Sequence, residues 1–198
     1  MILTVHGDLL LDSTSRTMRT ALVEQLLDRG RVIVDLSATT VREPSTAALF
    51  PAALAQAGGW PLARLVLTAP DPSTTKILQG NRVHLTVPLA RDVGHARLLL
   101  GVRPQRVVRS HELPCIPTAP ALARSFVNVL REEWQLPDEL CDIALTVATV
   151  LVSNAVEHAR TSCVLYLAFD ARRLHIAVRD QLPESYGLPR RGPHGDRG

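Results

Sequence analysis

The sequence is poor in several features that mark specialised classes of protein. Its three cysteines, Cys115, Cys141 and Cys163, are widely spaced and form no CxxC pair. Odd in number and isolated, they favour reduced structural thiols over a disulfide framework or a zinc site. No apolar run approaches the roughly 18 residues that a membrane-spanning helix needs, and the N-terminus lacks the basic segment that opens a secretory signal. We therefore expect a cytoplasmic protein that is not attached to a membrane.

Lysine and aromatic residues are also scarce. Lys76 is the only lysine, and arginines scattered along the chain supply the rest of the Lys and Arg total. Aromatic residues make up 4% of the sequence and the formal net charge is +3. Nucleic-acid surfaces combine a basic block with interleaved aromatics. Because the sequence has no such block, we expect no direct binding to nucleic acid.

What remains is the composition of an ordinary globular protein, 46% hydrophobic and 21% charged. Its length of 198 residues accommodates two small domains of about 100 residues each, or one larger domain. Four prolines between positions 104 and 120 interrupt the helical periodicity. We place the boundary just before them, which predicts one domain over 1–101 and a second over 102–198.

Strand-like and helix-like stretches alternate in the first hundred residues, which indicates an α/β fold with local crossovers. The continuous apolar residues that follow Gly30 predict a strand covered on both faces. The predicted elements are, in order, a strand pair or one bent strand (2–11), a helix (13–29), a strand (31–37), a helix with Pro44 in its first turn (about 45–57), a strand (62–68) and a short helix (72–81).

Ser45 stands at the predicted start of a helix, where a hydroxyl is most often only a cap. The segments "GDLLLDS", "VIVDLSATTV" and "REPSTAAL" change that interpretation. In this order they resemble the STAS domain of anti-sigma factor antagonists, over residues 1 to about 100, and the resemblance makes Ser45 the phosphorylatable serine. Glu43 and Pro44 precede it, and Thr46 replaces the family's glycine as a second hydroxyl. A phosphate at the helix start would repel an acidic or apolar partner and so switch docking.

A strand, two helices and a hairpin are predicted after the proline-rich stretch. They cover 106–114, 119–136, 136–159 and 162–184, respectively. Within the longer helix, Val150, Asn154 and His158 lie four residues apart and share one stripe. That stripe either faces something polar or hides the amide of Asn154.

The run from "ELPCIPTAPAL" to "LHIAVRD" resembles the histidine-kinase-like ATPase domain of anti-sigma factor serine/threonine kinases, within the GHKL superfamily, over residues 106–198. The resemblance implies that Asn154 ligates a Mg²⁺ ion bridging the nucleotide phosphates, that His158 belongs to the same nucleotide site and that Asp180 accepts a hydrogen bond from the adenine amino group. A neutral amide suits Mg²⁺ because it supplies an oxygen without adding charge. The alternative is that Asn154 only bonds a neighbouring backbone group.

Two departures from the family pattern bear on activity. The family has a glutamate four residues before the asparagine, where it acts as the general base, and this chain has Val150 at that position. Loss of a general base typically lowers the reaction rate by roughly 10²–10⁴-fold. We therefore assign no catalytic residue. On the phosphate side only the final "GDRG", with Gly195 and Gly198, is similar to the family's glycine box. We expect ATP and Mg²⁺ to bind weakly, and residues 183–198 to lack regular structure.

Together the resemblances imply an α/β protein with a STAS-like sheet and helices, followed by a two-layer α/β sandwich of the GHKL ATPase type. They imply a partner-switching regulator of an alternative sigma factor that binds sigma factor, anti-sigma factor or antagonist proteins and turns over little or no ATP. The alternative is an active serine kinase that phosphorylates an antagonist or its own Ser45. Val150 favours the regulator. The resemblances are compatible with a homodimer as well as with a monomer.

Overall fold

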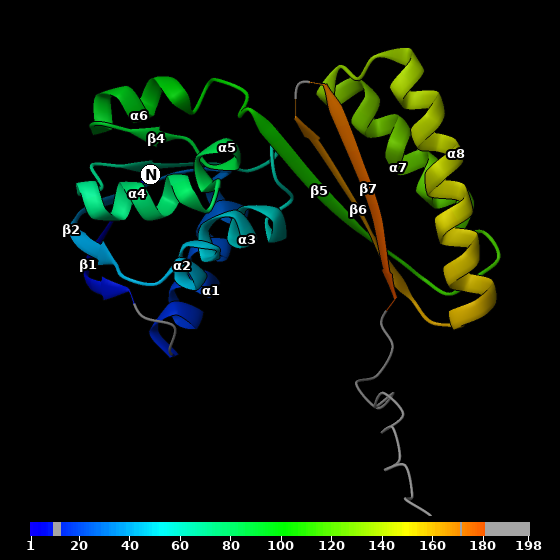
Figure 1. The fold of residues 1–198 in the computed structure, drawn as a ribbon, viewed down its shortest axis with the longest axis horizontal. Helices are drawn as coiled ribbons and strands as arrows, with labels where there is room; N and C mark the ends of the chain where they lie inside the picture. Colours follow the sequence, from blue (N-terminus) through cyan, green and yellow to red (C-terminus); the bar gives the residue numbers. More distant parts are fainter. Residues whose placement is uncertain (10–12, 171, 181–198) are drawn as a thin grey trace, which may run out of the picture.

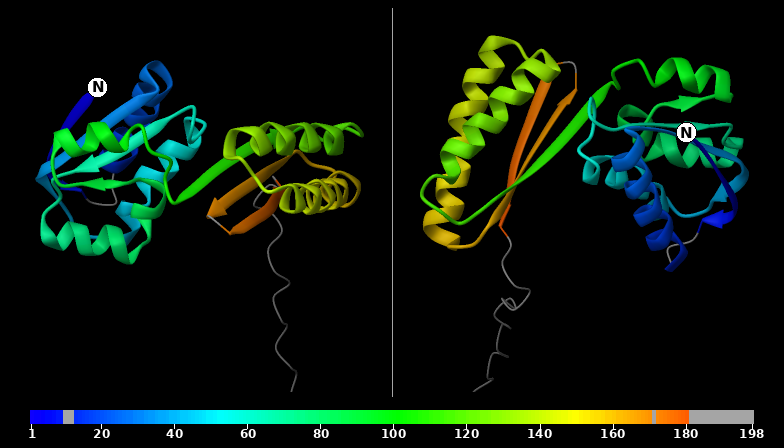
Figure 2. Two further views of the ribbon diagram at one scale, coloured as in Figure 1. Left: turned by 90° about the horizontal axis from the view of Figure 1, so that it is seen from above. Right: turned by 180° about the vertical axis from the view of Figure 1, so that it is seen from behind.

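A computed structural model describes residues 1–9, 13–170 and 172–180 (Figure 1). This part of the chain is mixed α/β and contains one parallel and one antiparallel sheet, which confirms the predicted class. The two sheets lie side by side, each with its own helices (Figures 1 and 2). The predicted boundary at 101/102 falls in the connection between them, although the division into two domains stays a prediction.

The first sheet has four parallel strands in the order β1-β2-β3-β4. The segment predicted as a strand pair or one bent strand is a single strand, and its pairing with β2 shifts register between Thr4 and His6. Such a bulge bends a strand. In chain order the elements are β1 (Ile2–Leu9), α1 (Ser13–Arg29), β2 (Arg31–Val41), α2 (Pro44–Ala47), α3 (Leu49–Gln56), β3 (Arg64–Thr68), α4 (Pro72–Gly80), α5 (Val83–Thr86), β4 (Leu89–Ala90) and α6 (Val93–Leu99).

Both faces of the central strand β2 are covered, as the sequence predicts. Val32, Val34 and Leu36 pack in a core shared with α1, α3 and α4. Ile33 packs on the opposite side with Ala96 of α6. The sequence of a strand that is buried on both faces is a continuous run of apolar residues, because neither face is exposed to solvent.

The helix predicted over about 45–57 is wrong in one respect, because the structure has two helices there. α2 ends at Ala47 and α3 begins at Leu49. Pro51 accounts for the break, since it has no N–H to donate to the carbonyl of Ala47 and its ring crowds that carbonyl. The segment that carries Ser45 is therefore a single helical turn.

The second sheet has three antiparallel strands in the order β5-β6-β7. Its elements are β5 (Arg106–Leu113), α7 (Ala119–Trp134), α8 (Asp138–Asn154), a π-helical turn η1 (Ala155–Ala159), β6 (Cys163–Asp170) and β7 (Arg173–Asp180). The predicted strand, the two helices and the hairpin are confirmed. α7 and α8 pack together on one face of this sheet (Figure 2).

α8 buries mostly small side chains on its sheet-facing side: Cys141, Ala144, Ala148 and Val152. Their spacing of three and four residues defines one helix face. Burial also raises the pKa of the Cys141 thiol. The core of this half therefore depends on only one side of α8, which leaves the other side free to vary.

The outer side of α8 is apolar as well. Ile143, Val147 and Val150 are exposed there. By length and composition, the helical segment Asp138–Ala159 is long and apolar enough to cross a membrane. By length and composition, the expectation that no segment could span a membrane is therefore wrong. Core helices of water-soluble proteins satisfy the same two criteria.

Trp60, Arg103, Trp134 and Phe169 join the two halves. The guanidinium carbon of Arg103 lies 5.7 Å from the ring centroid of Trp60 and 5.1 Å from that of Phe169. Its Nη1 donates to the carbonyl of Trp134 at 2.7 Å, and Trp134 Nε1 donates to the carbonyl of Trp60 at 3.3 Å. Burial lowers the pKa of Arg103. Ring faces and a carbonyl dipole take the place of the water that this cation has lost.

Replacing Arg103 with Met should weaken the contact between the two halves of the protein. Methionine keeps an apolar stem but donates nothing to the Trp134 carbonyl, and a hydrogen bond from a charged group is worth about 1.5–3 kcal/mol. We expect urea denaturation to show a free energy of unfolding lower by about 1–3 kcal/mol. Trp60 and Trp134 are the only two tryptophans, so their fluorescence should change too. Arg97→Met, at an exposed position of α6, is the control. Equal losses in both variants would contradict the role of Arg103.

Candidate functional site

A pocket of about 360 Å³ lies where the end of α8 meets β7. This volume is within the range of small-molecule sites, about 300–1,000 Å³. The helix ends there in the π-helical turn η1, in which Arg160 N donates to Ala155 O at 3.2 Å. Such turns are frequent at functional sites. The lining residues are Leu151, Asn154, Ala155, His158, Ala159 and Val178.

Asn154 and His158 both line this pocket and are exposed, so the predicted stripe faces outward. The hydroxyls of Thr146 and Thr149 on the same helix donate to backbone carbonyls. The amide of Asn154, in contrast, makes no hydrogen bond to any residue that the structure describes. The interpretation of Asn154 as a mere backbone partner is therefore not supported, and its oxygen is free to accept from, or ligate, a bound molecule.

Asp180 is the last residue of β7, at the strand position paired with Cys163. Because successive strand positions alternate between faces, positions 178 and 180 belong to the same face of the sheet. Val178 lines the pocket, whereas the side chain of Asp180 lies outside what the structure describes, so its contact with adenine stays a prediction. Gly195 and Gly198, together with the tail over 183–198, lie outside the described residues.

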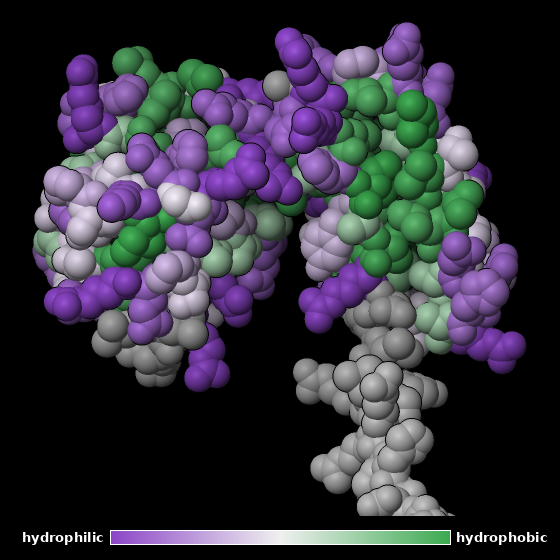
Figure 3. All heavy atoms as spheres, viewed as in Figure 1, coloured by the Kyte–Doolittle hydropathy of each residue, from purple (hydrophilic) through white to green (hydrophobic). Residues whose placement is uncertain are grey.

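Val150 occupies the position at which the family resemblance implies a general base. It is 52% exposed, one turn before Asn154, and continues an exposed apolar strip with Ile143 and Val147. Figure 3 shows apolar side chains gathered over this part of the molecule. A hydrocarbon cannot accept a proton from an attacking hydroxyl. None of the described residues that line the pocket is acidic, so none of them offers a carboxylate in place of the missing base.

A magnesium nucleotide fits this pocket only in part. Mg²⁺ prefers several oxygen ligands in octahedral geometry, and the lining offers it the amide oxygen of Asn154. Among the described residues there is no group of three His, Cys, Asp or Glu side chains that could hold a metal ion. The apolar walls, Leu151, Ala155 and Val178, suit an adenine ring. The residues therefore fit the adenine end and do not fit metal-assisted phosphoryl transfer.

The second candidate site lies at the carboxyl end of β2, where the chain turns into α2. α4 holds this strand end in place, because the buried hydroxyl of Thr74 accepts a hydrogen bond from the Val41 N–H at 3.0 Å. Asp71 caps α4 and accepts from the backbone N–H groups of Ser73 and Thr74. Hydrogen bonds from the Ser73 hydroxyl first, and then from Thr74, lower the pKa of Asp71 to about 2. The turn that carries Ser45 is thus anchored at its base.

Ser45 is exposed in the first turn of α2, as predicted. Its Oγ donates to Oε2 of Glu43 at 3.4 Å. Thr46, the other candidate hydroxyl, is only 1% exposed, so an enzyme cannot reach it in the folded protein. Of the two hydroxyls, Ser45 is the one accessible to modification.

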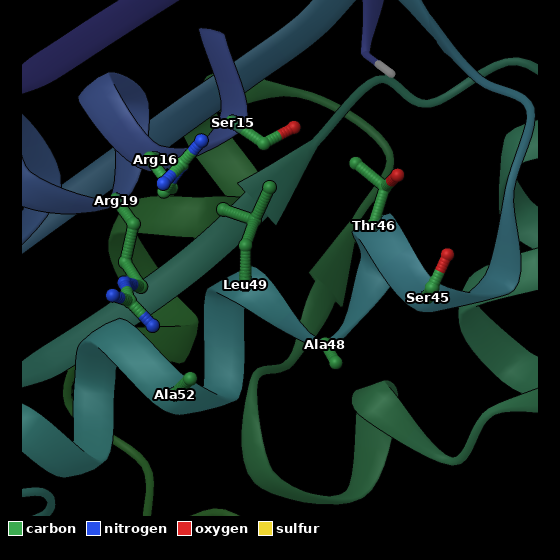
Figure 4. Close-up of a pocket in the computed structure, with 8 residues that line it drawn as sticks. All are labelled: Ser15, Arg16, Arg19, Ser45, Thr46, Ala48, Leu49 and Ala52. Carbon is green, nitrogen blue, oxygen red and sulfur yellow. The ribbon is translucent and has the colours of Figure 1, made fainter. Parts of the chain in front are cut away.

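Arg16 and Arg19 of α1 lie across a pocket from Ser45, and the sequence patterns did not point to them (Figure 4). Their spacing of three residues does place them on one face of a helix. Which face of α1 meets the start of α2 depends on how α1 packs against α3, and this is a tertiary property.

No model of a known protein family matches this chain, and a search of curated proteins finds no match either. The functional argument therefore depends on the two sites themselves.

We expect adenine nucleotides to bind weakly and with little preference for ATP over ADP. The apolar walls contact the base, which both nucleotides share, whereas the described lining offers the phosphates chiefly Asn154. Titration with a fluorescent ATP analogue, with and without Mg²⁺ and with ADP as competitor, measures both affinities. Asn154→Ala should remove the effect of Mg²⁺, and Asn128→Ala, at an exposed position of α7, should not. Tight binding with a strong preference for ATP would contradict this expectation.

Proposed function

We propose that this protein is a cytoplasmic partner-switching regulator of an alternative sigma factor. In this proposal a STAS-like N-terminal half and a GHKL ATPase-like C-terminal half bind sigma factor, anti-sigma factor or antagonist proteins. The observation that carries it is the position of Ser45, an exposed hydroxyl on an anchored turn at the end of β2. A surface serine held in this way can be modified without disturbing the core.

Phosphorylation of Ser45 would act through charge. A phosphoserine carries about −1.5 to −2 charges at neutral pH. Beside it lies the surface of α2 and α3, where Ala48 and Ala52 are exposed. An acidic side chain of a partner that docks over this surface in the unmodified state would meet the negative phosphate, and like charges repel. The unmodified form therefore binds and the modified form releases.

The second half contributes binding rather than catalysis in this proposal. Asn154, with its unpaired amide, favours a bound nucleotide, and this feature also supports the second candidate function, an active serine kinase. Val150 favours the regulator, as does the absence of acidic residues from the described part of the pocket lining. Nucleotide, where it binds, then acts as a structural or regulatory ligand.

Phosphotransfer from ATP should be absent or very slow, and Val150→Glu should raise any residual rate. A carboxylate one turn before Asn154 would restore a proton acceptor, and such a base typically contributes about 10²–10⁴ in rate. Incubation with labelled ATP and an antagonist protein carrying the STAS serine measures the transfer. Val147→Glu, which also adds a carboxylate to an exposed position of α8, is the control. Rapid labelling by the unaltered chain would favour the kinase.

Ser45→Asp should weaken binding to an anti-sigma factor by about tenfold, equivalent to about 1.4 kcal/mol. The added carboxylate lies beside Glu43 and puts negative charge on the docking surface. Isothermal titration calorimetry measures the affinity. Gln79→Asp, at an exposed position on α4, is the control and should bind like the parent. If the two variants bind equally well, Ser45 is not at the docking surface.

A further inference from the structure

Ser45 shares a pocket of about 430 Å³ with Arg16 and Arg19 of α1. Figure 4 shows the arginines on α1 at one side and Ser45 and Thr46 on α2 at the other, with Leu49 between them. The remaining lining residues are Ser15, Ala48 and Ala52. The pocket therefore combines two cations, several hydroxyls and an apolar floor.

Within the described part of the chain, no carboxylate compensates the positive charge of this pocket. Arg16 and Arg19 are exposed, and neither guanidinium forms an ion pair with a carboxylate of the residues described. None of the described residues that line the pocket is acidic. Guanidinium groups present several N–H donors in a planar fork that matches phosphate geometry. Two of them on one helix face suit a doubly charged anion.

Thr46 adds a hydroxyl whose hydrogen-bonding capacity is not used. Its side chain is 1% exposed, and its Oγ1 has no hydrogen-bond partner within the described part of the chain. Buried hydroxyls are normally hydrogen-bonded. An anion seated in the pocket would supply the missing acceptor.

Glu43 determines which way a phosphoryl group on Ser45 would turn. The Oγ of Ser45 now donates to the Glu43 carboxylate at 3.4 Å. Phosphorylation removes that donor and places about −1.5 to −2 charges beside the carboxylate. Because like charges repel and opposite charges attract, the phosphoryl group is driven away from Glu43 and toward Arg16 and Arg19.

We propose that Arg16 and Arg19 form the receptor for the phosphoryl group of phosphorylated Ser45, an inference that rests on the proposed modification of this serine. A separate kinase would transfer the γ-phosphoryl group of ATP to Oγ, with release of ADP and a proton. The dianion then bridges α1 and α2 and fills the pocket over Leu49. Inorganic phosphate has the same chemistry and is the other source of a ligand. Phosphorylation thus closes the pocket to a partner's acidic side chain.

Phosphoserine introduced at position 45 of the full chain tests the proposal without a kinase or a partner. Its second pKa, ordinarily about 6, is read by ³¹P NMR in the otherwise unaltered chain and in R16Q/R19Q. Cations within about 4–6 Å favour the dianion. We expect the pKa of this phosphoserine to be lower by about half a unit or more when both arginines are present. Circular dichroism checks that both chains are folded.

Phosphoserine at position 73 is the matched control, since Ser73 is exposed and its hydroxyl also lies beside a carboxylate, that of Asp71. R16Q/R19Q should leave its pKa unchanged. Equal pKa values for phosphoserine 45 with and without the two arginines would overturn the proposal. Failure of the protein to bind an anti-sigma factor would count against the proposed function alone, because the titration needs no partner.

Titration with inorganic phosphate distinguishes the two possible ligands of the arginines, the phosphoryl group on Ser45 and a free phosphate ion. Added to the unphosphorylated chain, it should shift the ¹⁵N signals of the arginine side chains at millimolar concentration. That shift should disappear in R16Q/R19Q and after phosphorylation of Ser45, because the covalent phosphoryl group then fills the pocket. Binding of inorganic phosphate at the same two arginines that persists after phosphorylation would contradict the proposal.

Discussion

One half-buried cation, Arg103, links the two sheets. Arg103 reaches out of the segment between α6 and β5 and lies over the rings of Trp60 and Phe169, while its guanidinium donates to the carbonyl of Trp134. Trp134 in turn donates to Trp60. Each contact joins residues far apart in sequence, so the joint forms only when both halves have folded. It is the physical link between the half that carries Ser45 and the half that carries Asn154.

In α8, the residues that pack against the sheet and the residues predicted to belong to a binding site lie on different sides of the helix. The side that faces the sheet contains Cys141, Ala144, Ala148 and Val152, and these hold the helix in place. The outer side contains Val150 and Asn154, which are exposed and contribute little to the core. A change of side chain at position 150, such as loss of a general base, therefore costs the packing against the sheet little.

Much of the fold could be predicted from periodicity because the relevant signals are local. The run around Val32 to Leu36 indicated a strand covered on both faces. An amphipathic helix was indicated by the spacing of Leu122, Phe126, Val129, Leu130 and Trp134, of which the structure buries Phe126, Leu130 and Trp134 and exposes the other two. The secondary structure of residues 82–99 was harder to predict from the sequence. α5 and β4 are too short for a period to show, and no sequence signal predicted that α6 would cover the second face of the first sheet.

For the sites, sequence determined which chemical groups are present, and tertiary structure decided which of them meet. Local pattern placed Ser45 at a helix start and Val150 and Asn154 on one helix stripe, because these features are set by neighbours within four residues. Their predicted roles came from the family resemblances. The sequence could not show that Thr46 is buried while Ser45 is exposed, since that depends on packing against distant segments. Nor could it place Arg16 and Arg19 beside Ser45. Contacts between α1 and α2 arise from the way both helices pack on the parallel sheet, and no local pattern encodes that packing.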